Sequence, residues 1–177
     1  MERSVYVVLS QTGSILSRIL KFFTHDEYNH SSISLTSTLE EMYSFGRLNP
    51  YKPFPGGFVK EGKNTGTFKR FYKTTAKVLE FKVDEESYNQ LKLMLKYMEE
   101  NKNDYKYNYM GVLRAVFNKN YEPKGKFYCS QFVRFCLDTF NISNAKLLPR
   151  IVKPMDFMNL EEKRIIYTGV LSSYNCI

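Results

Sequence analysis

The residues best able to carry out covalent chemistry are a cysteine and one of two histidines. Cys129 heads an apolar stripe at helical spacing, made by Phe132, Val133, Cys136, Leu137 and Phe140. The pattern predicts a buried helix that begins at Cys129. Free backbone N–H groups and the positive end of the macrodipole at a helix N-terminus favour a thiolate. The alternative is an inert core cysteine, because free cysteine is among the most buried residue types.

A nucleophilic cysteine needs a nearby base, and the chain contains only His25 and His30. His30 opens a segment, residues 30–35, in which alternate residues fall on opposite faces, the period of a half-buried strand. A rigid strand can hold an imidazole in a fixed orientation. His25 lies in a polar stretch that favours a solvated loop, so we expect His30 to be the base.

The order of these motifs resembles the circularly permuted branch of the NlpC/P60 papain-like cysteine hydrolases, which includes YiiX-like and YycO-like proteins. In that branch the histidine strand precedes the cysteine helix. The resemblance rests on residues 28–35, on the strand at 42–45, on residues 127–132, and on the opening strand at 4–9 with residues 13–19 after it. It implies an α+β fold in which an antiparallel sheet packs against helices, including the one that bears Cys129. We expect a single domain over residues 1–177.

The resemblance also implies roles for individual residues. Cys129 would attack an amide or ester carbonyl, and His30 would act as general base and then general acid. Alignment of the second strand assigns the orienting role to Ser44, where the family more often has histidine, glutamate, asparagine or glutamine. Glu40 and Glu41 are competitors for that role. The Cys129 backbone N–H would meet the oxyanion, with Tyr128 or Gln11 as the second donor.

Three functions are compatible with this pattern. The first is a cysteine peptidase or amidase acting on a peptide-like or acyl substrate. The second is an acyltransferase or lipid-handling protein that uses the same Cys129–His30 pair, with a helix at Gln11–Thr24 on a membrane. The third is a non-catalytic module whose basic loops hold an anionic partner. Neither the substrate nor the oligomeric state follows from the sequence.

Composition narrows the class of protein. A chain of 177 residues with 43% hydrophobic residues suffices for one packed domain. The net charge of +8 favours an anionic surface or ligand. Three cysteines without regular spacing make no disulfide framework and suit a reducing interior. The spacing of a zinc site is absent, and we expect no metal and no cofactor.

The remaining patterns concern location and scaffold. The apolar stretch at residues 5–9 is too short to span a bilayer and lacks a signal cleavage site, so we expect a cytoplasmic protein without a transmembrane segment. Basic and aromatic residues interleave between residues 60 and 82, but no nucleic-acid signature accompanies them. We expect strands at 78–83 and 164–171, helices at 85–101 and 107–117, and an irregular segment over the Pro- and Gly-rich residues 49–67.

Overall fold

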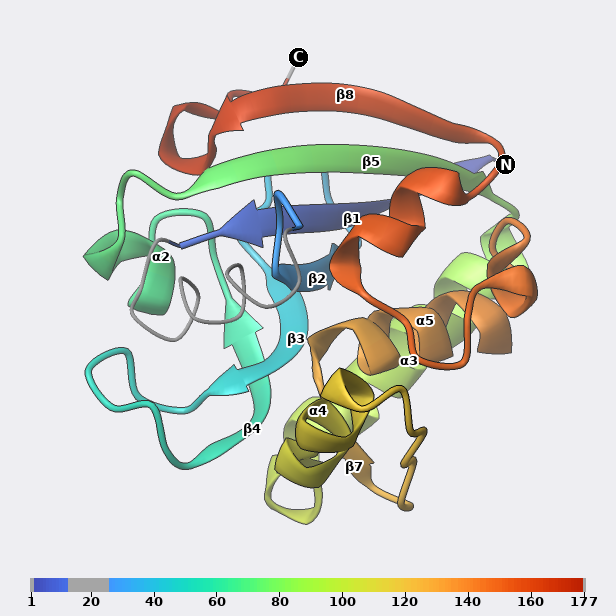
Figure 1. Cartoon of the computed structure of the whole chain (residues 1–177). Helices are drawn as coiled ribbons and strands as arrows, with labels where there is room; N and C mark the ends of the chain where they lie inside the picture. The colour runs from blue at the N-terminus through green and yellow to red at the C-terminus, as the bar shows by residue number, and fades with distance from the viewer. Residues whose placement is uncertain (1, 13–25, 177) are drawn as a thin grey trace.

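A mixed eight-stranded sheet forms the centre of the computed structural model, which describes residues 2–12 and 26–176 (Figure 1). The strands in chain order are β1 Arg3–Gln11, β2 His30–Ser34, β3 Met42–Arg47, β4 Gly56–Glu61, β5 Thr75–Val83, β6 Lys106–Tyr107, β7 Lys126–Phe127 and β8 Lys163–Val170. In space their order is β7-β6-β4-β3-β2-β1-β5-β8. The fold is therefore α+β, with β1 and β2 in the interior of the sheet.

The expectation of a purely antiparallel sheet is wrong at one edge. Six of the neighbouring pairs are antiparallel, but β6 and β7 run parallel, with Lys106 opposite Lys126. Parallel neighbours cannot be joined by a tight hairpin and need a crossover connection. Helix α4, Tyr109–Val116, supplies that crossover between the two short strands.

The other helices are α2 Gly66–Arg70, α3 Glu85–Glu100 and α5 Cys129–Thr139. Four short 3-10 turns lie at Lys102–Asp104, Ala145–Leu147, Pro154–Asn159 and Leu171–Ser173. The start of α3 follows from its sequence, because the Asp84 carboxylate accepts the Ser87 backbone N–H at 2.8 Å and satisfies one free donor of the first turn. Leu91, Leu95 and Met98 form the buried stripe of this helix.

Each face of the sheet carries its own core, as the alternation along β1 requires. Val5, Val7 and Leu9 enter the larger core, which α3 and α5 complete. Tyr6 and Val8 enter a smaller core on the opposite face, with Phe68 of α2 and Leu171 near the C-terminus. In Figure 1, α3 and α5 lie together below the sheet, while α2 lies at its left end.

Most predicted elements are present within a few residues of their expected bounds. The helices at 85–101 and 107–117 and the strands at 30–35, 78–83 and 164–171 correspond to α3, α4, β2, β5 and β8. The irregular segment at 49–67 is wrong in its second half, since β4 pairs with β3 from Gly56 to Glu61. The predicted Gln11–Thr24 helix lies outside the described residues beyond Thr12, and Gln11 itself ends β1.

Candidate active site

Cys129 is the first residue of α5, as its apolar stripe predicts. Its side chain is buried, with only 7% of the residue exposed. Phe132, one turn later, fixes the helix against the sheet: its ring lies 5.2 Å from that of Phe45 on β3 and 5.7 Å from that of Phe58 on β4. These aromatic contacts hold the first turn of α5 against β3 and β4.

The structure brings Cys129 and His30 together. His30 is the first residue of β2, and its imidazole hydrogen-bonds with the Cys129 thiol. The two residues are 99 positions apart in the chain. Strand β2 fixes the position of the imidazole, and the start of α5 fixes that of the thiol. The contact between Cys129 and His30 therefore follows from the packing of α5 on the sheet. His25 lies outside the described residues.

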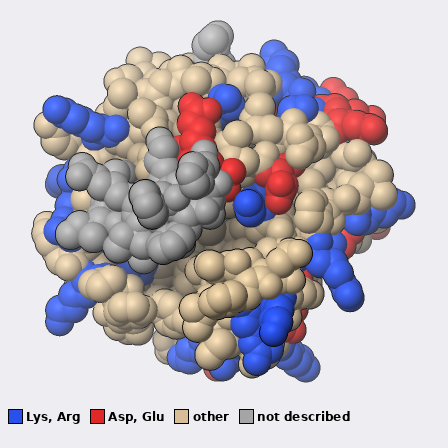
Figure 2. Space-filling view, viewed as in Figure 1, with Lys and Arg blue, Asp and Glu red and all other residues tan. Residues whose placement is uncertain are grey.

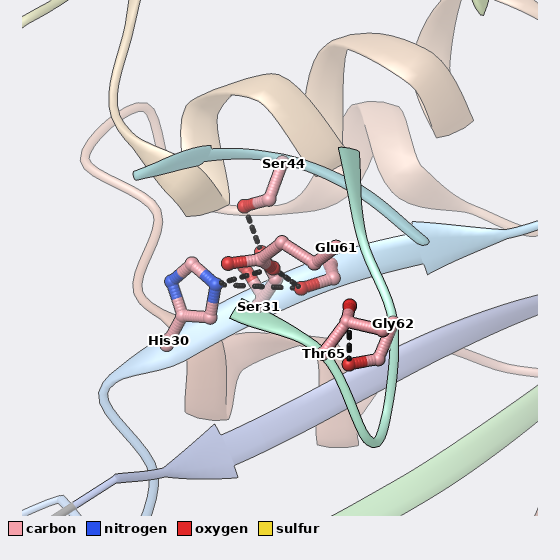
Figure 3. Close-up of polar contacts among 7 residues, drawn as sticks. His30, Ser31, Ser44, Glu61, Gly62 and Thr65 are labelled. Atoms are coloured by element: carbon pink, nitrogen blue, oxygen red, sulfur yellow. Dashed lines mark hydrogen bonds and ion pairs between the residues drawn. The ribbon is translucent and has the colours of Figure 1, made fainter. Parts of the chain in front are cut away.

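The third member of the cluster is Glu61, the last residue of β4. Its Oε2 accepts a hydrogen bond from His30 Nε2 at 3.0 Å and another from the Ser32 hydroxyl at 2.8 Å. Figure 3 shows both ring nitrogens of His30, with only one of them directed toward Glu61. The carboxylate therefore engages Nε2 of the same imidazole that hydrogen-bonds with the Cys129 thiol. This is the arrangement of a nucleophile, a base and an orienting carboxylate.

Charge and hydrogen bonding hold His30 in its protonated form. Burial disfavours the imidazolium, but the Glu61 charge, with hydrogen bonds to Cys129 and Glu61, outweighs it and raises the pKa of His30 to about 10. The side chains of His30 and Glu61 are only 18% and 12% exposed, so water screens their attraction weakly.

The same contacts favour the thiolate of Cys129. Burial acts against the charged sulfur, but the hydrogen bond and charge of His30, together with the backbone N–H groups of Ser31 and Ser130, lower the pKa of Cys129. Cys136 on the same helix shows the opposite effect, since burial raises its pKa well above the ordinary range. One helix therefore holds one activated and one inert cysteine.

Ser44 does not orient His30, so that expectation is wrong. Its hydroxyl donates instead to the backbone carbonyl of Ser31 at 2.7 Å (Figure 3). The reason lies in the sheet, because β2 and β3 pair only through Ile33 and Tyr43 and the ladder is open beside His30. The Ser44 hydroxyl donates to the Ser31 carbonyl, which the open ladder leaves without a strand partner. The Ser31 N–H donates to the Cys129 thiolate.

Glu40 and Glu41 do not take the orienting role either. Each pairs with a lysine at the surface: Glu40 with Lys63 at 3.6 Å and Glu41 with Lys60 at 2.9 Å. Sequence reasoning missed Glu61 because it placed residues 49–67 in a loop. The local signal is weak, because Phe58 and Val59 are the only strand-favouring residues among 56–61 and they follow two glycines.

The two suggested oxyanion donors have different surroundings. Tyr128 is buried beside Cys129, whose charge adds to burial in raising the pKa of the phenol, and its backbone N–H already donates to Gln131 Oε1 at 3.2 Å. Gln11 makes no hydrogen bond to the cluster within the described residues, where its buried Oε1 has no partner. Neither residue is placed as an oxyanion donor by these contacts.

A buried hydroxyl that sequence reasoning did not single out lies beside Cys129. Ser31 is fully buried, and its Oγ has no hydrogen-bond partner among the described residues. Its backbone N–H meets the Cys129 thiolate. An unpaired buried hydroxyl costs free energy unless a ligand or water satisfies it.

The described part of the chain lacks two further features, a metal-binding cluster and a membrane-spanning helix. Over residues 2–12 and 26–176 no group of three His, Cys, Asp or Glu side chains is arranged to hold a metal ion. No helix in these ranges has both the length and the apolar character needed to cross a bilayer. Comparison with protein-family models, curated proteins and solved structures finds no match to this chain.

Proposed function

We propose that this protein is a cysteine-dependent hydrolase that acts on an amide or ester bond, with a fold of the permuted NlpC/P60 papain-like type. The observation that carries the proposal is the linked set Cys129, His30 and Glu61. A buried thiol at a helix start hydrogen-bonds with an imidazole, and a carboxylate accepts a hydrogen bond from Nε2 of that ring at 3.0 Å. An inert core cysteine needs none of these contacts.

The chemistry follows from the charge state. The Cys129 thiolate attacks the carbonyl carbon, and the developing oxyanion meets the backbone N–H of Cys129, which has no acceptor within the first turn of α5. The His30 imidazolium then gives its proton to the leaving amine or alcohol, which leaves a thioester on Cys129. Neutral His30 next takes a proton from water, which attacks the thioester and restores the thiolate. Another acceptor in place of water would make the same enzyme an acyltransferase.

We assign the second oxyanion donor to the Ser31 hydroxyl. It is buried, it has no other partner in the described part of the chain, and the N–H of the same residue touches the sulfur. Ser31→Ala should therefore slow turnover about 10- to 1000-fold, the usual effect of removing one such donor. It should leave the rate of thiol alkylation within about twofold, because alkylation has no oxyanion.

Alkylation and ester turnover test the proposal together. Near pH 6 iodoacetamide should label Cys129 well before Cys136 and Cys176, and the protein should hydrolyse p-nitrophenyl acetate. Cys129→Ala should abolish turnover and His30→Ala should slow both reactions, while Cys176→Ser, a change at an exposed thiol, is the control. Equal and slow labelling of all three cysteines would leave the basic binding module as the better account.

A further inference from the structure

Helix α4 is amphipathic, but its large apolar residues face the solvent and its small residues face the protein. Its small residue Gly111 is buried, and Val112 and Ala115 are partly buried, so the side that meets the protein carries little side chain. The large apolar residues point to the solvent and are 41–68% exposed, namely Tyr109, Met110, Leu113, Val116 and Phe117. Soluble helices normally bury such residues and expose polar ones. Of these residues, Tyr109 contacts the rings of Phe54 and Tyr107, whereas the other four lie exposed on this side of α4.

The β3–β4 loop extends the same surface. Leu48, Tyr51 and Phe54 are 54–76% exposed. The loop adjoins the helix because the Phe54 ring lies 5.1 Å from that of Tyr109. We call these eight exposed residues of α4 and the loop the apolar face. Contiguous exposed patches of this kind mark interaction sites in soluble proteins.

The segments that form the apolar face are rich in positive charge. Residues 42–60, 62–79 and 105–121 contain eleven Lys and Arg residues and no Asp or Glu. Three of the eleven pair with acidic residues of other segments: Lys60 with Glu41 and Glu99, Lys63 with Glu40, and Lys77 with Glu27. The other eight are Arg47, Lys52, Lys69, Arg70, Lys73, Lys106, Arg114 and Lys119. Glu61, between the first two segments, is buried against His30. Figure 2 shows Lys and Arg side chains predominating along the lower margin, where α4 and the loop lie in Figure 1.

We infer that the apolar face is a docking surface for an anionic lipid bilayer. Exposed aliphatic and aromatic side chains would enter the interface, and the surrounding cations would meet the anionic headgroups, which supplies the two signals that stable membrane binding needs. Three of the residues on α4 are Met110, Leu113 and Val116, which cannot stack on bases, so the composition favours lipid over single-stranded nucleic acid. The inference does not depend on the chemistry of Cys129.

Vesicle binding by the full chain tests this inference, with Cys129→Ala as the parent so that thiol chemistry plays no part. The parent should co-sediment with vesicles of phosphatidylcholine containing about one-third phosphatidylglycerol, should bind pure phosphatidylcholine more weakly, and should be released by added salt. Binding to neither kind of vesicle would overturn the inference. Equal binding to both kinds of vesicle would show that the basic residues do not contribute to binding.

Two aspartate variants locate the surface. Leu113→Asp with Phe117→Asp should weaken vesicle binding at least about tenfold, because two apolar side chains no longer enter the interface. Leu147→Asp is the matched control: Leu147 is 72% exposed and lies beyond the far end of α5, so binding should not change. Equal loss in both proteins, or none in the first, would contradict the assignment.

A fluorescent reporter distinguishes insertion from simple attraction, because the chain contains no tryptophan. Phe117→Trp should show a blue-shifted emission when anionic vesicles are added, and Leu147→Trp should not. A shift on addition of an oligonucleotide but not of vesicles would overturn the bilayer as the occupant and favour nucleic acid.

Discussion

Glu61 favours the protonated form of the His30 imidazole. Its carboxylate contributes charge and a hydrogen bond of 3.0 Å to His30, which keeps a proton on the ring and thereby favours the Cys129 thiolate. Glu61→Gln keeps the shape and removes the charge. We expect it to lower the pKa of His30, to raise that of Cys129, and to slow ester turnover at least about 100-fold. Steady-state kinetics at pH 7, with alkylation rates beside them, check this. Turnover within about twofold of the unmodified protein would remove Glu61 from the site.

Ser44 stabilises the sheet, so its replacement should lower the free energy of unfolding. Ser44→Ala leaves the buried Ser31 carbonyl without its 2.7 Å hydrogen bond and should lower the free energy of unfolding by about 1–3 kcal/mol. Urea denaturation measures that loss. Turnover by the folded variant should stay within about threefold of the unmodified protein, because Ser44 is not a partner of His30. A large loss of turnover without a loss of stability would restore the orienting role to Ser44.

The pKa values of the pair predict different pH profiles for alkylation and turnover. The lowered pKa of Cys129 means that alkylation should rise with pH below the ordinary thiol range, near 8.5, and should not fall again. Turnover also needs protonated His30, so it should decline as the pH passes about 10, the pKa of that residue. Rates of alkylation and of turnover, each measured over this pH range with the rate of Cys129→Ala subtracted, test whether the two profiles differ. Parallel profiles with no decline would mean that His30 is not the proton donor.

Among the elements, β4 shows where sequence reasoning reached its limit. The helix at Cys129 and the strand at His30 could be predicted because each carries its own periodicity. Strand β4 could not, since Gly56 and Gly57 are typical of turns. Gly56 is needed for a close approach, because a Cβ there would lie 2.7 Å from the Tyr109 hydroxyl. The strand is specified by its pairing with β3 and by this contact with α4, and neither is visible in a local pattern.

Asn108 joins α4 to the helix that bears the nucleophile. Its amide nitrogen donates to the Tyr121 carbonyl at 2.7 Å and to Gln131 of α5 at 3.0 Å, and its oxygen accepts the Gly111 N–H at 2.8 Å. Asn108→Ala removes a helix cap and two buried hydrogen bonds, so we expect a loss of about 2–4 kcal/mol in the free energy of unfolding.

Asn101→Ala is the matched control for that measurement by urea denaturation. Asn101 also bonds through its amide nitrogen, to the Tyr97 carbonyl at 2.8 Å, but this contact is solvent-exposed and should cost less than about 1 kcal/mol. Similar losses in the two variants would show that the link between α4 and α5 contributes little to stability.

For the molecule as a whole, Glu80 couples stability to pH. Burial opposes its charge, but hydrogen bonds from Ser4 and Arg164 and the charges of Lys82 and Arg164 outweigh that effect, so the pKa of Glu80 is lowered. A lowered pKa gives stability that is present above the unfolded value, about 4.3, and is lost as the pH falls through the folded value.

Glu80→Gln should therefore destabilise the protein at pH 7, and its difference from the unmodified protein should shrink as the pH falls below about 4. Thermal unfolding at a series of pH values measures the difference. Glu86→Gln, a change at an exposed position of α3, should have little effect at any pH. A difference for Glu80→Gln that grows on acidification would contradict the sign of the coupling.

For the whole molecule, the composition predicted a core large enough for one domain and favoured an anionic partner, but it did not predict the exposed apolar face. The helix at 107–117 was expected, yet its pattern does not say which side faces the protein. That side is decided by Gly111, Val112 and Ala115, whose small size lets α4 lie close to its neighbours. Orientation is a property of tertiary packing, so it became visible only in the structure.

The order of the three clustered residues along the chain has a consequence during synthesis. His30 and Glu61 lie in the first part of the chain and Cys129 follows 99 residues after His30, so Cys129 is the last of the three to leave the ribosome. Domains generally fold as units, and contacts between distant residues form slowly. Until α5 docks, Cys129 is an ordinary thiol with little thiolate at neutral pH. A fast-alkylating thiol is therefore expected only after α5 has packed against β2, where His30 and Ser31 contact the sulfur.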